Sequence, residues 1–215
     1  MSEVTPTVNL GLDFLKNKKS LTDETIKLFK LGFKKDNKIY GCSGLNIPES
    51  VSNNSIIIPI MDIQGNYYGY STRNLLSETK YIHEKNLKFE NILYGIDKTI
   101  ENIIKLNCVV LVEGFFDMIA LYQKGIINVV AVCGLNMSYK KRSILSRYCN
   151  NWVIAFDGDK PGIEAANCLK KSLDNTGINC HVFDTPASTD PDELDKGSWD
   201  KLWTLAQNTG NEIRV

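Results

Sequence analysis

Histidine and paired cysteines are scarce in this chain. It has 2 histidines and 6 cysteines, and the cysteines are scattered without a C-x-x-C pair. Structural zinc sites draw their ligands from closely spaced cysteines and histidines, so we predict no zinc in this chain. Cys108 and Cys133 stand inside apolar runs, where a free cysteine behaves as a small buried hydrophobe.

An excess of charge of either sign is also lacking, because 25 Lys and Arg residues balance 25 Asp and Glu residues. The net charge therefore gives no indication of a nucleic-acid partner. No apolar run approaches the roughly 20 residues that span a bilayer. The segment Met1–Pro6 has neither the charged nor the apolar part of a signal peptide. We expect no membrane partner and a cytoplasmic location, in the host cytoplasm if a virus encodes the chain.

The 215 residues, of which 43% are hydrophobic, allow one sizeable core or two small ones. The pattern of residues changes near position 105, so we predict two parts, residues 1–105 and residues 106–215. The second part alternates strand-like and helix-like segments. Strands are expected at 108–112, 128–132, 152–156 and 179–183, and helices near 115–124, 138–148, 161–175 and 198–208. Strands separated by helices of this length imply parallel crossovers.

The first part reads as smaller and mixed. Thr22 predicts the start of a helix, with Gly32 as its stop, and residues 34–54 look irregular. A hairpin is expected next, with a first strand over Ser55–Met61 in which Pro59 indicates an edge position or a bulge. The predicted fold class is therefore α/β: a mostly parallel sheet flanked by helices, preceded by a smaller α+β subdomain.

Acidic residues directly follow two of the predicted parallel strands. Glu113 and Asp117 follow the first strand, and Asp157 and Asp159 follow the third. Open α/β sheets bind ligands at the carboxyl ends of their strands. Carboxylates gathered there repel one another unless a cation joins them, and hard oxygen ligands suit Mg²⁺ or Mn²⁺. The pattern predicts a metal-dependent phosphate site.

A plainer interpretation is that each acid caps the helix that follows it. For any one position the two interpretations weigh about equally. For Glu113, Asp157 and Asp159 together the metal site is favoured, because caps prefer Asp to Glu and rarely need two acids around a glycine. Asp190 and Asp192 bracket a proline, and a surface turn remains an alternative for them.

The order of these motifs resembles the TOPRIM fold of primases, topoisomerases and some nucleases, and most closely the catalytic core of bacterial-type, DnaG-like primases. The matching motifs are Val112–Asp117, Gly125–Ile126, Gly134, Asp157–Gly162 and Asp190–Leu194, preceded by Leu31–Phe33, Ile58–Ile60, Gly69–Tyr70, Arg73, Lys80–Tyr81 and Leu93–Gly95. The resemblance spans residues 10–205.

This resemblance implies template-directed synthesis of short RNA primers on single-stranded DNA from ribonucleoside triphosphates. It implies catalytic roles for Glu113, Asp157 and Asp159. It implies that two or more Mg²⁺ or Mn²⁺ ions are held by six acids: Glu113, Asp117, Asp157, Asp159, Asp190 and Asp192. It also implies that a second group faces the template and the nucleotide: Arg73, Asn74, Lys80 and Tyr81. For this second group, a solvated strand end and loop is the alternative interpretation.

The resemblance further implies partners outside this chain, namely a separate zinc-binding module, a helicase or another replisome protein. The sequence departs from the family pattern at Ile82-His83, where Leu-Asn is usual, and at Leu135-Asn136, where Thr-Ala is usual. Two other functions stay open. One is a TOPRIM nuclease, since the same metals can activate water, and the other is a non-catalytic DNA-binding or regulatory module.

Overall fold

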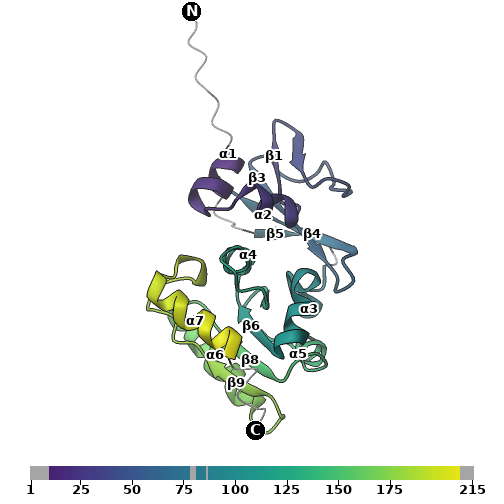
Figure 1. The fold of residues 1–215 in the computed structure, drawn as a ribbon. Helices are drawn as coiled ribbons and strands as arrows, with labels where there is room; N and C mark the ends of the chain where they lie inside the picture. The colour runs from purple at the N-terminus through teal and green to yellow at the C-terminus, as the bar shows by residue number, and fades with distance from the viewer. Residues whose placement is uncertain (1–9, 78–80, 86, 209–215) are drawn as a thin grey trace, which may run out of the picture. The chain divides into compact units, whose positions relative to one another are not determined.

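The computed structural model describes residues 10–77, 81–85 and 87–208, which form two compact units (Figure 1). The first unit includes the described residues up to Ile60 and again from Tyr67 to Leu87. The second includes Met61–Asn66 and the described residues from Lys88 onward. The functional division at residue 105 stays a prediction.

A five-stranded sheet with the strand order β2-β1-β3-β4-β5 forms the first unit, together with short helical segments. Its strands are β1 Gly32–Lys35, β2 Lys38–Gly41, β3 Ser55–Met61, β4 Tyr67–Asn74 and β5 Tyr81–His83. Its helical segments are α1 Leu10–Asp13, the π-helical turn η1 Phe14–Lys18 and α2 Asp23–Leu28. β1 pairs antiparallel with β2 and with β3, and β4 pairs antiparallel with β5.

The predicted start of α2 is confirmed, but its predicted end is wrong. Thr22 caps the helix, since its Oγ1 accepts a hydrogen bond of 3.2 Å from the Thr25 N–H. The left-handed residue after the helix is Lys30, with φ 50°. Gly32 instead begins β1, where a Cβ would lie 2.3 Å from the Cys42 sulfur. The glycine is required by close packing rather than by a helix stop.

Residues 34–54 are not uniformly irregular, because they contain the end of β1 and all of β2. Asp36 and Asn37 have positive φ and join the two strands by a two-residue turn. β2 is largely exposed, so it shows no apolar alternation from which a strand could be predicted. This is why the sequence pattern missed it.

Pro59 lies in an interior strand of the sheet, so the prediction of an edge strand is wrong for β3 as a whole. β1 pairs with β3 at Ser55, Ile56 and Ile57. Pro59 lies beyond this paired stretch, where its missing N–H removes no bond from the β1 ladder.

The second unit contains a parallel sheet with the strand order β7-β6-β8-β9, which confirms the predicted fold class. Its strands are β6 Cys108–Val112, β7 Val129–Ala131, β8 Asn151–Ile154 and β9 Asn179–Val182. Its helices are η2 Phe89–Asn91, α3 Ile96–Leu106, α4 Phe115–Gln123, α5 Tyr139–Leu145, α6 Lys160–Leu173, η3 Pro191–Glu193 and α7 Lys196–Asn208.

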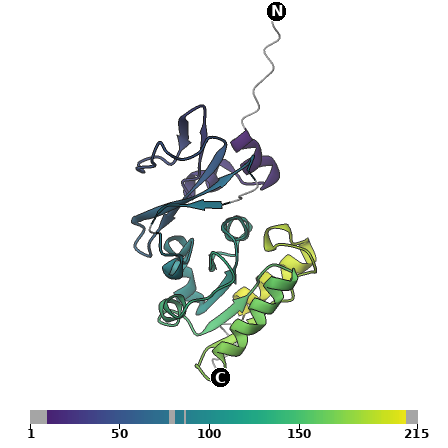
Figure 2. The ribbon, with the colours of Figure 1, turned by 180° about the vertical axis from the view of Figure 1, so that it is seen from behind.

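Helices cover both faces of this parallel sheet. Side chains of α3, α5 and α6 form one apolar cluster with alternate residues of the central strands, among them Leu111 and Trp152. α4 packs against β7, and α7 packs against β6. α7 lies toward the viewer in Figure 1 and α6 in Figure 2, so the two helices cover opposite faces. All residues of β6 and β8 are buried, as expected for strands covered on both sides.

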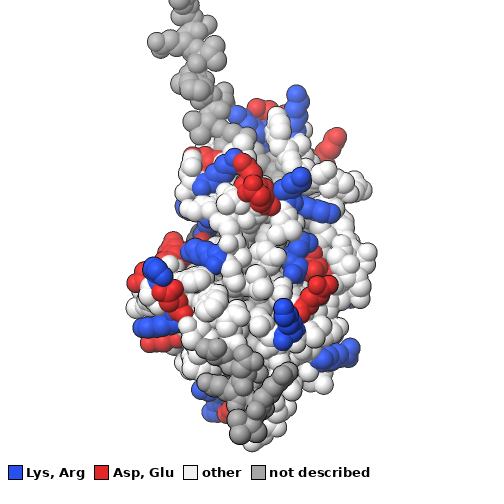
Figure 3. All heavy atoms as spheres, in the orientation of Figure 1, with Lys and Arg blue, Asp and Glu red and all other residues white. Residues whose placement is uncertain are grey.

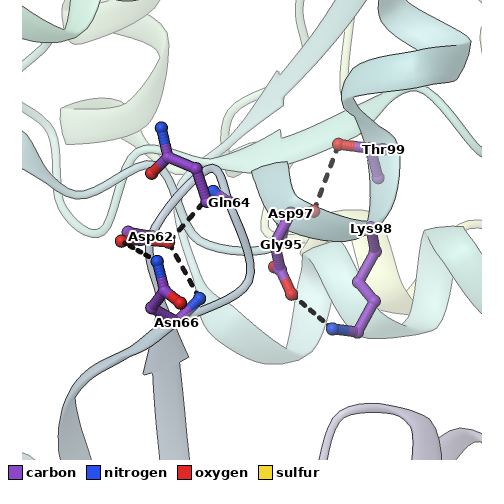
Figure 4. A network of polar contacts seen from close by, with 7 residues as sticks. All are labelled: Asp62, Gln64, Asn66, Gly95, Asp97, Lys98 and Thr99. Atoms are coloured by element: carbon purple, nitrogen blue, oxygen red, sulfur yellow. Dashed lines mark hydrogen bonds and ion pairs between the residues drawn. The ribbon is translucent and has the colours of Figure 1, made fainter.

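The turn between β3 and β4 belongs to the second unit, and Ile63 packs against its apolar cluster. Asp62 holds the turn by accepting hydrogen bonds of 2.9 Å from the backbone N–H groups of Gln64 and Asn66 (Figure 4). The same view shows the first turn of α3, where Asp97 and Lys98 form an ion pair. No helix in the described part of the chain is long and apolar enough to cross a bilayer.

Candidate metal centre

Three segments of the second unit hold the six predicted acids. Glu113 directly follows β6, and Asp117 lies in the first turn of α4. Asp157 follows β8, and Asp159 is the N-cap of α6. Because β6 and β8 are parallel neighbours, their carboxyl ends meet at one edge of the sheet. The remaining two acids, Asp190 and Asp192, lie at the N-cap and within the η3 turn.

Asp117, Asp190 and Asp192 form a compact triad. One carboxylate oxygen from each lies within 4.8 Å of the others. Asp117 is buried, and its Oδ2 accepts a hydrogen bond of 3.0 Å from the Gly114 N–H, whereas Asp190 is exposed. The triad therefore has a fixed member on α4 and an open side on η3, as a cation site needs.

Glu113 and Asp157 form a half-buried pair beside the triad. Glu113 Oε1 accepts a hydrogen bond of 3.0 Å from the backbone N–H of Asp157. Burial raises the pKa of Glu113 to about 7, helped by the negative charges of Asp159, Asp117 and Asp190 and opposed by that hydrogen bond. Burial likewise raises the pKa of Asp157 to about 7, helped by the charges of Glu113 and three other acids.

Two glycines of the site have no room for a side chain. A Cβ on Gly162, in the first turn of α6, would lie 2.3 Å from the Asp157 carbonyl oxygen and 2.7 Å from Glu113 Oε1. A Cβ on Gly158 would lie 1.9 Å from the Pro186 carbonyl oxygen. The glycines of the Asp157–Gly162 motif are thus packing requirements of the site.

The donor set fits a hard divalent cation. All six side chains offer carboxylate oxygens, which are the ligands that Mg²⁺ and Mn²⁺ prefer. The Oδ1 atom of Asp157 is buried, and the described residues provide it with no hydrogen-bond partner. A buried acceptor of this kind costs free energy unless a ligand satisfies it.

We expect the stability of the metal-free protein to fall as the pH rises from 6 to 8. The folded-state pKa values of Glu113 and Asp157 lie near 7, above the values of about 4 in the unfolded chain. The folded state therefore holds these protons more tightly, and their stabilising contribution is lost as the pH rises through 7. In EDTA the melting temperature should decrease by a few degrees between pH 6 and pH 8, since a loss of about 1 kcal/mol in the free energy of unfolding lowers it by about 2–4 °C for a protein of this size.

Two controls separate this effect from general titration. The melting temperature of Glu113→Gln should depend less on pH over the same interval, because one of the two groups no longer titrates. Saturating Mn²⁺ should also reduce the dependence, since a cation favours the ionised carboxylates. Equal pH slopes in wild type, Glu113→Gln and the Mn²⁺-bound protein would contradict the account.

Three of the four residues predicted to face nucleic acid, Arg73, Asn74 and Tyr81, lie on β4 and β5 of the first unit. The Arg73 guanidinium lies over the rings of Phe14 and Tyr81, at 5.0 and 5.3 Å from their centroids, and donates a hydrogen bond of 3.0 Å to the Tyr81 hydroxyl. Asn74 uses its amide to hold the neighbouring loop through Asn53, and Lys80 lies outside the described residues. Their predicted role stays a prediction.

Sequence reasoning missed two polar contacts beside the predicted residues. Lys124 at the end of α4 donates a hydrogen bond of 2.9 Å to the carbonyl oxygen of Asp192, 68 residues away. Sequence spacing gives no sign of such a contact. The ring of His83 is bonded to Ser71 Oγ through Nδ1 at 2.8 Å, and its ring plane lies within 10° of that of Tyr81. The period-2 spacing of Tyr81 and His83 is the signal from which their shared face was predictable.

Comparison with known proteins gives one family match and several curated relatives. Residues 110–195 match the Toprim-like family. A DNA primase of Staphylococcus aureus is 34% identical over 160 residues, which is 72% of this chain and 26% of that protein. The chain thus spans about a quarter of the length of the curated relatives that it matches.

Solved structures share the fold over nearly the whole chain. The Aquifex aeolicus primase, solved with its zinc-binding and RNA polymerase domains, is 23% identical with a TM-score of 0.74, covering 91% of this chain and 55% of that one. A DnaG primase catalytic domain bound to single-stranded DNA is 22% identical with a TM-score of 0.73, covering 94% of this chain and 72% of that one. The fold of this chain is that of the DnaG catalytic core.

Proposed function

We propose that the protein is the nucleotidyl-transferring core of a DNA primase. Its residues 110–195 match the Toprim-like family, and its fold is that of the DnaG catalytic core. It would join ribonucleoside triphosphates into short RNA on a single-stranded DNA template. The observation that supports this most is the convergence of six acids, two of them with a pKa near 7, at the carboxyl edge of the parallel sheet. Such a cluster can hold the cations that accompany a bound polyphosphate.

In this proposal the acids hold two or more divalent cations, Mg²⁺ or Mn²⁺. Asp117, Asp190 and Asp192 form one ligand set, and Glu113, Asp157 and Asp159 form the neighbouring one. Cations held by these acids would supply charge neutralisation for the phosphates and in-line alignment of the reacting oxygens. The 3′-hydroxyl oxygen forms the new bond to the α-phosphorus, and pyrophosphate leaves.

Glu113 is the group best suited to accept the hydroxyl proton. Its pKa is about 7 in the metal-free protein, and a bound cation would lower it, so the carboxylate would be ionised at working pH and able to accept a proton. Oε1 is held by the Asp157 N–H, which orients the carboxylate and leaves Oε2 to take the proton. Asp159 Oδ1 accepts a hydrogen bond of 2.8 Å from the Gly162 N–H, which fixes the acid at the start of α6.

Local groups of the first unit would bind the template. On the face drawn in Figure 3, the Lys and Arg side chains are interspersed with Asp and Glu. Arg73 provides a guanidinium, and the neighbouring Tyr81 ring provides a surface on which a base can stack. The likeness to a DnaG domain solved with single-stranded DNA supports this assignment.

We expect Arg73→Ala to weaken single-stranded DNA binding and to lower its salt dependence. Loss of one phosphate contact removes about 0.7 from the slope of log K against log salt for a single strand. Fluorescence anisotropy with a labelled oligonucleotide at several salt concentrations measures both quantities. Lys38→Ala is the matched control, because it removes a cation from the other edge of the same sheet. An unchanged slope for Arg73→Ala, or an equal decrease for Lys38→Ala, would remove Arg73 from the binding face.

Incubating the protein with labelled nucleic acid and Mn²⁺ tests the proposed chemistry. A DNA template with a short annealed RNA avoids any need for a separate zinc module or helicase at initiation. Extension of the RNA with ribonucleotides supports the proposal. Shortening of the DNA would indicate a nuclease instead, and DNA binding without either product would indicate a non-catalytic module.

A further inference from the structure

The metal triad is assembled from two elements that are far apart in the sequence. Asp117 lies on α4, Asp190 is the N-cap of the three-residue η3 turn, and Asp192 lies within that turn. A 3₁₀ turn of this length has little stability of its own. The carboxylate of Asp190, the residue at its N-cap, makes no capping hydrogen bond to the turn. The triad geometry therefore depends on what holds η3 against α4.

Repulsion works against this geometry. Three carboxylate oxygens within 4.8 Å of one another repel when they are ionised, and two of the three belong to the η3 segment. Upstream, the Gly158 N–H donates to the Thr189 carbonyl oxygen at 2.9 Å, which ties the incoming segment to the β8–α6 connection. That bond holds the segment before Asp190 and leaves the turn itself to be held from α4.

Lys124 adds a polar connection between the two elements, which also pack against each other. It caps the C-terminus of α4, and its Nζ donates a hydrogen bond of 2.9 Å to the Asp192 carbonyl oxygen. A cation suits this position, because it binds a carbonyl near the end of a helical turn. The bond uses the backbone of Asp192, so it leaves that residue's carboxylate for a metal ion.

We propose that Lys124 is a positioning residue of the metal centre: by bonding the Asp192 carbonyl, it holds η3 against α4 and keeps the oxygens of the triad close enough to share one cation. The inference rests on the metal centre of the proposed function. It concerns the affinity for the cation rather than the chemistry, so it is testable without nucleotide or DNA.

A purely electrostatic role and a positioning role of Lys124 predict opposite changes in cation affinity when the residue is replaced. Removing a positive charge near carboxylates strengthens cation binding by electrostatics alone. Removing a hydrogen bond that orients metal ligands weakens it, typically by 10-fold or more. The sign of the change in Mn²⁺ affinity therefore distinguishes a positioning role from a nearby charge.

The experiment measures Mn²⁺ dissociation constants by electron paramagnetic resonance for the full chain and its variants. Lys124→Met should raise the dissociation constant about tenfold. Lys124→Arg, which keeps a long cationic donor, should restore an affinity close to that of wild type. Lys140→Met is the matched control, because Lys140 is an exposed lysine of the same unit that pairs with Glu90. Lys124 is exposed, so folding should survive, and melts in EDTA verify it. Lys124→Ala, which also lacks a donor and should weaken binding equally, serves if Lys124→Met does not fold.

Affinity in Lys124→Met that equals or exceeds that of wild type would overturn the inference. So would an equal loss in Lys140→Met. Failure of the proposed metal centre itself would look different, because wild type and Asp117→Asn would then bind Mn²⁺ equally weakly.

Discussion

Asp157→Asn is expected to abolish nucleotide incorporation and, at the same time, to raise the melting temperature of the metal-free protein at pH 8. The pKa of Asp157 is raised to about 7 by burial and by the charges of Glu113, Asp190 and other acids. At pH 8 the folded protein therefore holds an ionised carboxylate where its surroundings disfavour one. Asparagine removes that charge and keeps the size of the side chain.

The two effects have different magnitudes. A gain of about 1 kcal/mol would raise the melting temperature by about 2–4 °C. Loss of a metal ligand is expected to remove about 4 kcal/mol of transition-state stabilisation, which corresponds to a decrease of about a thousandfold in rate.

Asp174→Asn is the matched control, because it removes one acid from the exposed opposite end of α6. It should leave both the rate and the melting temperature near wild type. A melting temperature of Asp157→Asn below that of wild type in EDTA would contradict the claim that the ionised Asp157 carboxylate destabilises the metal-free protein.

Gly158→Ala is expected to disrupt the site through the backbone. A Cβ at this position would lie 1.9 Å from the Pro186 carbonyl oxygen, so the segment after β9 must move away. That segment is bonded to Gly158 on both sides, since the Gly158 N–H donates to Thr189 and the Gly158 carbonyl accepts from the Ser188 N–H at 2.8 Å. Because Asp190 follows directly, displacement of the segment moves Asp190 and Asp192 away from Asp157 and Asp159.

The expected cost of Gly158→Ala is about 1–3 kcal/mol in the free energy of unfolding, together with about a tenfold loss of Mn²⁺ affinity. Chemical denaturation and metal titration measure the two quantities. Gly197→Ala is the control, because a Cβ there would meet Asp195 at an ordinary 3.7 Å, and alanine in a helix gains up to about 1 kcal/mol over glycine. Equal stability and metal affinity for Gly158→Ala and wild type would show that the loop accommodates a side chain.

The parallel half of the fold was predictable because its signals are local. The runs at 108–112 and 152–156 are continuously apolar, since strands covered on both faces need no alternation. The acids that follow them stand at the carboxyl edge of the sheet for the same reason. Chain direction and strand adjacency together place Glu113 next to the Asp157 segment.

The first unit was harder to predict because its strands are short and partly exposed. β2 presents mostly exposed residues, and its polar sequence resembles a loop. The prediction from Pro59 was wrong because it inferred the position of a whole strand from one residue. β1 pairs with β3 only at Ser55–Ile57, so no hydrogen bond to β1 is required at Pro59. The bond from Lys124 to Asp192 depends on tertiary packing alone, and no sequence pattern indicates it.

The most direct test of the account compares wild type with Asp157→Asn in extending an annealed RNA on a single-stranded DNA template. Both proteins are supplied with ribonucleoside triphosphates and Mn²⁺ under identical conditions. Wild type should lengthen the RNA one ribonucleotide at a time, whereas Asp157→Asn, folded and at least as stable in EDTA, should not. Extension of the RNA by Asp157→Asn at the wild-type rate, or no extension by wild type, would contradict the proposed function.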